Sequence, residues 1–117
     1  MEVLFIVLND LSYMGDILKV FVEEKVRGAT ILESEGMAKA VLKNEGLGML
    51  LTGPFASSLP KSIGESKTLF TVIPDAQTVT RVVNAIQHLL STSKKDTIGF
   101  MFTLPVTGIY PLKKRNK

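Results

Sequence analysis

Four stretches of the chain carry the apolar patterns of β-strands. The first, Val3 to Leu8, is continuously apolar and β-prone, as is typical of a strand buried on both faces. Apolar stretches at 29–35 and 67–73 predict a second and a third strand, and Pro74 ends the third because proline cannot donate to the ladder of a sheet. In 98–106 the large apolar residues alternate strictly with the residues between them, which predicts a fourth strand.

Two other stretches have the apolar spacing of amphipathic helices. The first follows Asn9, Asp10 and Ser12, whose side-chain oxygens are suited to capping a helix. We expect Gly28 to end this helix, because a glycine just past a helix readily takes the left-handed conformation. Asp75 is expected to cap the second helix. The apolar positions that define them are Ile17, Val20, Phe21 and Val26 in the first, and Val79, Val82, Val83, Ile86 and Leu90 in the second.

The order β-α-β followed by β-α-β predicts one α+β domain over 1–112 with a ferredoxin-like βαββαβ fold, an antiparallel sheet with two helices on one face. The third strand places Leu69 and Ile73 on one side and Phe70 and Val72 on the other. Two helices can cover only one face. At about 25 cal/mol per Å² of apolar surface, leaving the other face wet would forfeit several kcal/mol, which is comparable with the stability of a small domain. We therefore expect a homo-oligomer that buries the open faces together.

A long connection, 37–66, joins the second and third strands without a steady period. Connections of this length in compact domains are usually functional or disordered. Its glycines, prolines and serines suit a loop, but it also holds many large apolar residues, which would favour docking to a surface. We expect a partly ordered loop whose partner-binding residues are Met49, Leu50, Leu51 and Phe55.

Composition and charge narrow the class of protein. The formal net charge is +3, but four cations lie in 113–117, and subtracting them leaves −1 on the rest. This basic tail does not predict nucleic-acid binding, which needs cations spread over a folded face. The chain has no cysteine, and its longest apolar run is too short to span a membrane or to form a secretory signal. A cytoplasmic location without membrane insertion is the expectation.

No set of residues predicts catalysis or a metal site. The serines lack the surroundings of a nucleophile elbow, and the only histidine, His88, falls on the polar side of the second helix. Glu33 and Glu35 have the spacing of paired carboxylates but more often form ion pairs beside an interface. We expect a protein that is not an enzyme and has no catalytic or metal-binding residues.

Three ordered segments resemble the PII signal-transduction family. They are "VRGATILESEGMAK" at 26–39, "TLFTVIPDAQTVTRVVNAIQHL" at 68–89 and "GFMFTLPV" at 99–106. The resemblance covers nearly the whole chain and lies in the combination rather than in one motif. It implies a trimeric regulator whose sheets face inward, with 37–66 as the counterpart of the T-loop that such proteins insert into target proteins such as transporters or enzymes. It also implies a nucleotide in the cleft between subunits.

The resemblance further implies the ligand-binding residues. The base of the loop begins at Gly36 and continues through Met37, Ala38 and Lys39; Ala38 and Ala40 replace a glycine and a glutamine of the family. The phosphate-binding turn corresponds to Lys94, Lys95 and Gly99, with Phe100 where the family has lysine. Pro111 and Lys113 stand where two arginines are expected. These departures favour a divergent member with another small ligand, for which an adenine nucleotide is a candidate.

Two other hypotheses stay open. A metal-tolerance protein of the CutA type is also a trimer of this topology, although clustered metal ligands would be expected in it. A small enzyme on the same scaffold is the third, since a fold does not define a function.

Overall fold

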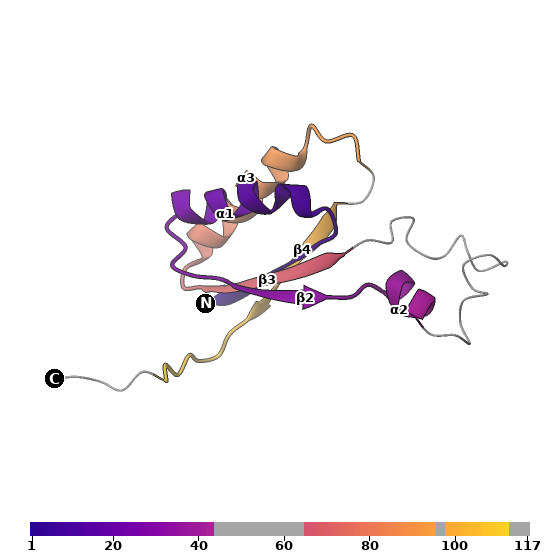
Figure 1. Ribbon diagram of the computed structural model, residues 1–117. Helices are drawn as coiled ribbons and strands as arrows, with labels where there is room; N and C mark the ends of the chain where they lie inside the picture. The colour runs from indigo at the N-terminus through magenta and orange to yellow at the C-terminus, as the bar shows by residue number, and fades with distance from the viewer. Residues whose placement is uncertain (44–64, 96–97, 113–117) are drawn as a thin grey trace.

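The computed structural model describes residues 1–43, 65–95 and 98–112 (Figure 1). The strands are β1 (Glu2–Leu8), β2 (Thr30–Ser34), β3 (Ser66–Ile73) and β4 (Gly99–Pro105). The helices are α1 (Met14–Glu23), α2 (Met37–Lys43) and α3 (Ala76–Leu90), and a 3-10 turn, η1 (Leu11–Tyr13), precedes α1. The four predicted strands are confirmed, and their ends differ from the predicted ones by no more than one residue.

The strands form an antiparallel sheet in the order β2-β3-β1-β4, with β2 and β4 at its edges. Helices α1 and α3 lie over the same face of this sheet, and α2 lies beyond the end of β2 (Figure 1). The predicted α+β class is therefore confirmed, and the arrangement is compatible with a ferredoxin-like fold.

The core lies between the sheet and the two long helices. Alternate residues of β1 point into it, and Leu4, Ile6 and Leu8 are almost fully buried. They pack with further residues that are at most 8% exposed: Ile17, Val20, Phe21, Leu69, Ile73, Val79, Val82 and Ile86. The apolar stripe predicted for each helix is thus the stripe that faces the sheet.

The end of α1 differs from the prediction. The helix ends at Glu23, and Lys25, not Gly28, has the left-handed conformation, with φ of 62°. The amide of Val26 donates to the carbonyl of Phe21 at 2.8 Å, and the amide of Lys25 donates to the carbonyl of Val22 at 3.1 Å. This pair of hydrogen bonds is the Schellman pattern. Gly28 instead offers its carbonyl oxygen to the buried hydroxyl of Thr71, which ties the α1–β2 connection to β3.

The connection 37–66 is not a continuous loop. Its first seven residues form α2, and Ser66 already belongs to β3. The segment "MAKAVLK" consists mostly of strong helix formers, and its Val41 is buried. Lys43 in its last turn pairs with Glu35 at 2.6 Å, as expected for an ion pair of one of the two glutamates. Residues 44–64, including Met49, Leu50, Leu51 and Phe55, lie outside the described residues.

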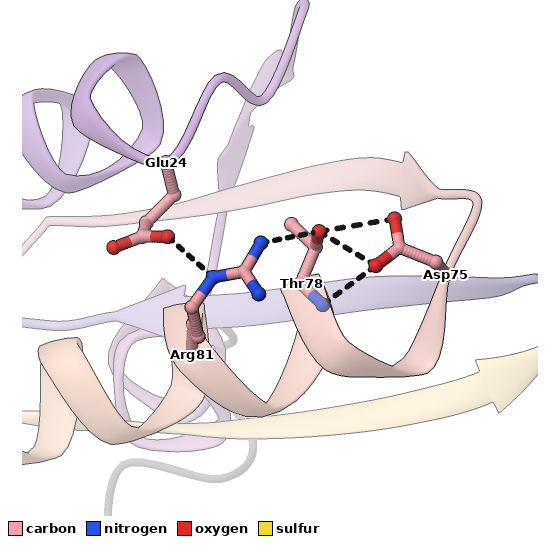
Figure 2. Close-up of polar contacts among 4 residues, drawn as sticks. All are labelled: Glu24, Asp75, Thr78 and Arg81. Atoms are coloured by element: carbon pink, nitrogen blue, oxygen red, sulfur yellow. Dashed lines mark hydrogen bonds and ion pairs between the residues drawn. The ribbon is translucent and has the colours of Figure 1, made fainter.

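A chain of polar contacts connects α1 to the start of α3 (Figure 2). As predicted, Asp75 caps α3: its carboxylate accepts from the amide of Thr78 at 2.9 Å and from the Thr78 hydroxyl at 2.8 Å. Arg81 donates to that hydroxyl at 3.0 Å and to Glu24, just past α1, at 2.9 Å. The hydrogen bonds from Thr78 lower the pKa of Asp75 below its usual value of 3.8.

The lowered pKa of Asp75 predicts a pH-dependent stability. Because the carboxylate is favoured in the folded state, its contribution is present above pH 3.8 and is lost as the pH falls through the lower folded value. An Asp75→Asn variant keeps a good N-cap but cannot titrate there. Urea denaturation at about pH 5 and pH 2 should show a smaller loss of unfolding free energy in the variant than in the wild type. An equal loss would contradict this assignment.

Candidate functional site

The face of the sheet opposite α1 and α3, here called the open face, is apolar. Strand register places on it the side chains that alternate with the core residues. Apart from Thr30, Ser34, Ser66 and Thr68, they are Val3, Phe5, Val7, Leu32, Phe70, Val72, Phe100, Phe102 and Leu104. None of these described strand positions carries a charge.

A row of phenylalanines crosses the open face. Phe5 on β1 lies opposite Phe70 on β3 and Phe102 on β4. Its ring centroid is 5.7 Å from that of Phe70 and 4.9 Å from that of Phe102, which is stacked on it; Phe100 follows at 6.1 Å from Phe102. Phe100 is 59% exposed and Leu104 is 49% exposed. Monomeric proteins rarely expose a continuous apolar patch of this kind.

A second feature, here called the α3–β4 pocket, lies on the helix side of the sheet. It has a volume of about 520 Å³, within the range of small-molecule sites. Its floor reaches the core at Leu8, Ile17 and Ile86, which are at most 1% exposed. Its walls include Leu90, Ile98 and Met101, and its polar side chains are Gln87, Ser91 and Lys95.

Lys95 is held over the start of η1. Its ammonium group forms an ion pair with Asp10, whose carboxylate also accepts from the hydroxyl of Ser12 at 2.6 Å and from its amide at 3.1 Å. The amide of Lys95 donates to the hydroxyl of Ser93 at 3.2 Å, and Tyr13 donates to the same hydroxyl at 2.9 Å.

The ion pair shifts the pKa values of both Asp10 and Lys95. The contact with Lys95, together with the hydrogen bonds from Ser12, lowers the pKa of Asp10 from 3.8 to about 2. The contact with Asp10 raises the pKa of Lys95. Asn9, Asp10 and Ser12 were expected to cap the first helix. Asp10 instead caps η1 and also pairs with Lys95, and α1 begins at Met14 without a side-chain cap.

Gly99 allows β4 to start beside the end of β1. Its φ is 154°, and a Cβ atom at this position would lie 2.1 Å from the carbonyl oxygen of Val7. Only glycine fits such a backbone conformation and approach. Next to it, the carbonyl of Ile98 accepts from the amide of Asn9 at 2.7 Å, so the start of β4 is fixed to the end of β1. Gly99 therefore has a structural role independent of any ligand.

The predicted loop base lies at the other edge of the sheet. Gly36 precedes α2 and accepts from the amide of Ala40 at 3.1 Å; Met37 and Ala38 lie in the first turn of α2, where Met37 is 59% exposed. Lys39 lines a polar hollow of about 400 Å³ with Lys43, Ser34, Ser66, Glu33, Glu35 and Glu65. In this hollow the hydroxyls of Ser34 and Ser66 lie 2.7 Å apart.

The two predicted groups of ligand-binding residues share one end of the sheet but not one site. Leu8 pairs with Lys67 on β3 and Gly99 on β4, and Ser34 pairs with Ser66, so both groups flank the same end. They follow β2 and precede β4, which are the two outer strands. Three strand spacings separate these strands by about 14 Å. One chain therefore does not bring the groups together.

Other predicted residues are placed as follows. Lys94 and Pro111 are exposed, as is His88 in the last turn of α3, where it was expected to face solvent. Lys113 lies outside the described residues. Among those that are described, no group of His, Cys, Asp or Glu is arranged to hold a metal ion. No helix in the described part of the chain has the length and apolarity needed to cross a membrane.

Sequence reasoning missed Gln87, Ser91 and Ile98 as pocket residues. They look like ordinary helix and turn positions, and only the fold brings them beside Leu8 and Ile17. No protein-family model matches the chain, and a search of curated proteins finds no match. The likeness to PII proteins therefore stays a prediction that rests on residues and topology.

Replacement of Gly99 provides a test of its structural role. Gly99→Ala should lower the free energy of unfolding by about 1–3 kcal/mol from the backbone conformation alone, and further through the contact with Val7. Gly15→Ala is the matched control: it lies in α1 with open space around its Cβ and should stabilise by about 0.5–1 kcal/mol. Urea denaturation measures both, and a neutral Gly99→Ala would contradict the role.

Proposed function

We propose that this protein is a PII-like signalling regulator without enzymatic activity. It assembles as a homotrimer, binds a small ligand at the clefts between subunits, with an adenine nucleotide as the first candidate, and controls a partner protein through loop 37–66. The observation that carries the proposal is the open face, which is apolar, uncharged and not covered by α1 or α3.

The chemistry of the open face favours a second copy of the chain as its occupant. The phenylalanine row would suit stacked nucleotide bases, but binding a nucleic acid also needs cations for the phosphates, and the described strand positions of this face carry none. Apolar, uncharged surfaces are the kind that obligate homo-oligomers bury. Copies of this chain would cover the face with equally apolar surface.

The positions of the two predicted ligand-binding groups support a site between chains. Gly36 and Lys39 lie beside β2, and Lys95 and Gly99 lie beside β4, at the same end of the sheet but at opposite edges. A neighbouring copy could place its β4 edge against the β2 edge of the first. Such a cleft would unite groups that one chain keeps apart.

The regulatory step follows from the long connection. It starts with α2, whose first residues, Met37 to Lys39, belong to the predicted loop base. A ligand there would therefore contact the root of the segment that carries Met49, Leu50, Leu51 and Phe55. A ligand can control the loop only if it favours one loop state over another. The partner is a transporter or an enzyme, in a cytoplasmic setting.

The oligomeric state tests the main observation. Light scattering after size exclusion should give about three times the chain mass of 12.8 kDa. Phe102→Lys places a charge in the phenylalanine row of the open face and should reduce the assembled mass. Val22→Lys is the control, because Val22 is already 75% exposed on α1, and it should leave the mass unchanged. A monomeric wild-type protein would contradict the proposal.

Thermal unfolding with added ligands tests the sensor function. A ligand that binds only the native protein raises Tm, and at a concentration 100 times its Kd it stabilises by about 2.7 kcal/mol. Adenine nucleotides and cyclic dinucleotides should be compared with divalent metals. No shift with any nucleotide would contradict the ligand part of the proposal, and a shift with metals alone would favour the CutA-type alternative.

A further inference from the structure

The α3–β4 pocket has two chemically different parts. Its floor and walls are apolar and reach the core through Ile17 and Ile86. Its polar side chains, Gln87, Ser91 and Lys95, come from the end of α3 and the turn after it. Among the lining residues within 1–43, 65–95 and 98–112, Lys95 is the only one with a charge. A mainly apolar, solvent-open hollow whose described lining carries a single cation is complementary to a ligand with an apolar body and one negative charge.

We infer that this pocket binds an amphipathic carboxylate, an apolar chain or ring whose single carboxylate group meets the ammonium group of Lys95. The apolar body would lie against Ile17, Ile86 and Leu90, where burial of each methylene group favours binding. A nucleoside polyphosphate fits less well, because several negative charges would share one cation and the base would meet an apolar floor.

The contact between Lys95 and Asp10 supports this ligand class. Lys95 already pairs with a carboxylate supplied by the chain, and the hydrogen bonds from Ser12 hold that carboxylate in place. The ammonium group has three donors, so it can hold a second carboxylate beside that of Asp10 or exchange one for the other. Asp10 therefore acts as an internal competitor that weakens binding of the ligand.

This inference goes beyond the proposed regulatory function. The described lining residues of the pocket belong to a single copy of the chain, and most of them lie on the helix side of the sheet; only Val7 and Phe100 also belong to strand positions of the open face. The proposed binding therefore needs neither the trimer nor a cleft between subunits. Lys95 belongs both to the α3–β4 pocket and to the proposed cleft between subunits. A ligand bound in one of these sites would therefore change the affinity of the other for its ligand.

Octanoate is the probe for the first experiment. With 13C-labelled methyl groups, titration should shift the signals of Ile17, Ile86 and Leu90, which line the pocket, and leave those of Val3, Val72 and Leu104 on the open face unchanged. Hexanoate and decanoate extend the series, and each added methylene should tighten binding about three- to four-fold. Shifts confined to the open face, or no saturable shift, would overturn the inference.

Three variants test the role of the charge. Lys95→Met should weaken octanoate binding about ten-fold or more while leaving 1-octanol, the uncharged analogue, unchanged. Lys94→Met is the matched control, because Lys94 is the exposed neighbour that does not line the pocket, and it should change octanoate affinity less than about two-fold. Asp10→Asn removes the competing charge and should tighten octanoate binding but not octanol binding. Equal losses for Lys94→Met and Lys95→Met would overturn the inference.

The Phe102→Lys variant separates the two proposals. Phe102 does not line this pocket, so octanoate should bind this variant as it binds the wild type, whatever its oligomeric state. Loss of octanoate binding together with loss of assembly would place the ligand in the oligomer interface and overturn the inference, without contradicting the trimer. Octanoate binding to a monomeric protein would support the inference even though the proposed function had failed.

Discussion

The structure depends on a strand that is apolar on both of its faces. In β1, Leu4, Ile6 and Leu8 complete the core beneath α1 and α3, whereas Val3, Phe5 and Val7 begin the open face. Because β1 is central and pairs with both β3 and β4, its alternation fixes which side of each neighbour meets the helices. A shift of one residue in either pairing would exchange core and surface, so the apolar run determines both the register of the sheet and the surface available for association.

Most of the fold could be predicted because its signals are local. The strands follow from apolar runs and alternation, and α3 from its stripe and the cap at Asp75. The end of α1 could not be predicted, because Lys25 in the left-handed conformation gives no signal in the sequence. Gly28, three residues later, gives a misleading signal. Short α2 was missed because seven residues are too few to establish a helical period beside the glycines that follow.

The candidate site was less predictable because it depends on contacts between distant positions. Asp10 was expected as a cap and Lys95 as an anion-binding residue, yet nothing in the sequence pairs them across 85 positions. The pocket likewise combines residues of β1, α1, α3 and β4. The resemblance to PII proteins identified the turn that holds Lys95, but the chemistry of the space beneath that turn followed only from the packing of the two helices on the sheet.

The position of β1 between β3 and β4 also has a consequence for folding. Its partner β4 follows α3 in the sequence, so one edge of β1 stays unpaired until residues 99–105 have been synthesised. During that interval a nascent chain presents an apolar strand with free backbone donors and acceptors, which is a template for wrong pairing with other unfinished chains. Synthesis of this protein in the cell is therefore expected to depend on chaperones that shield growing chains.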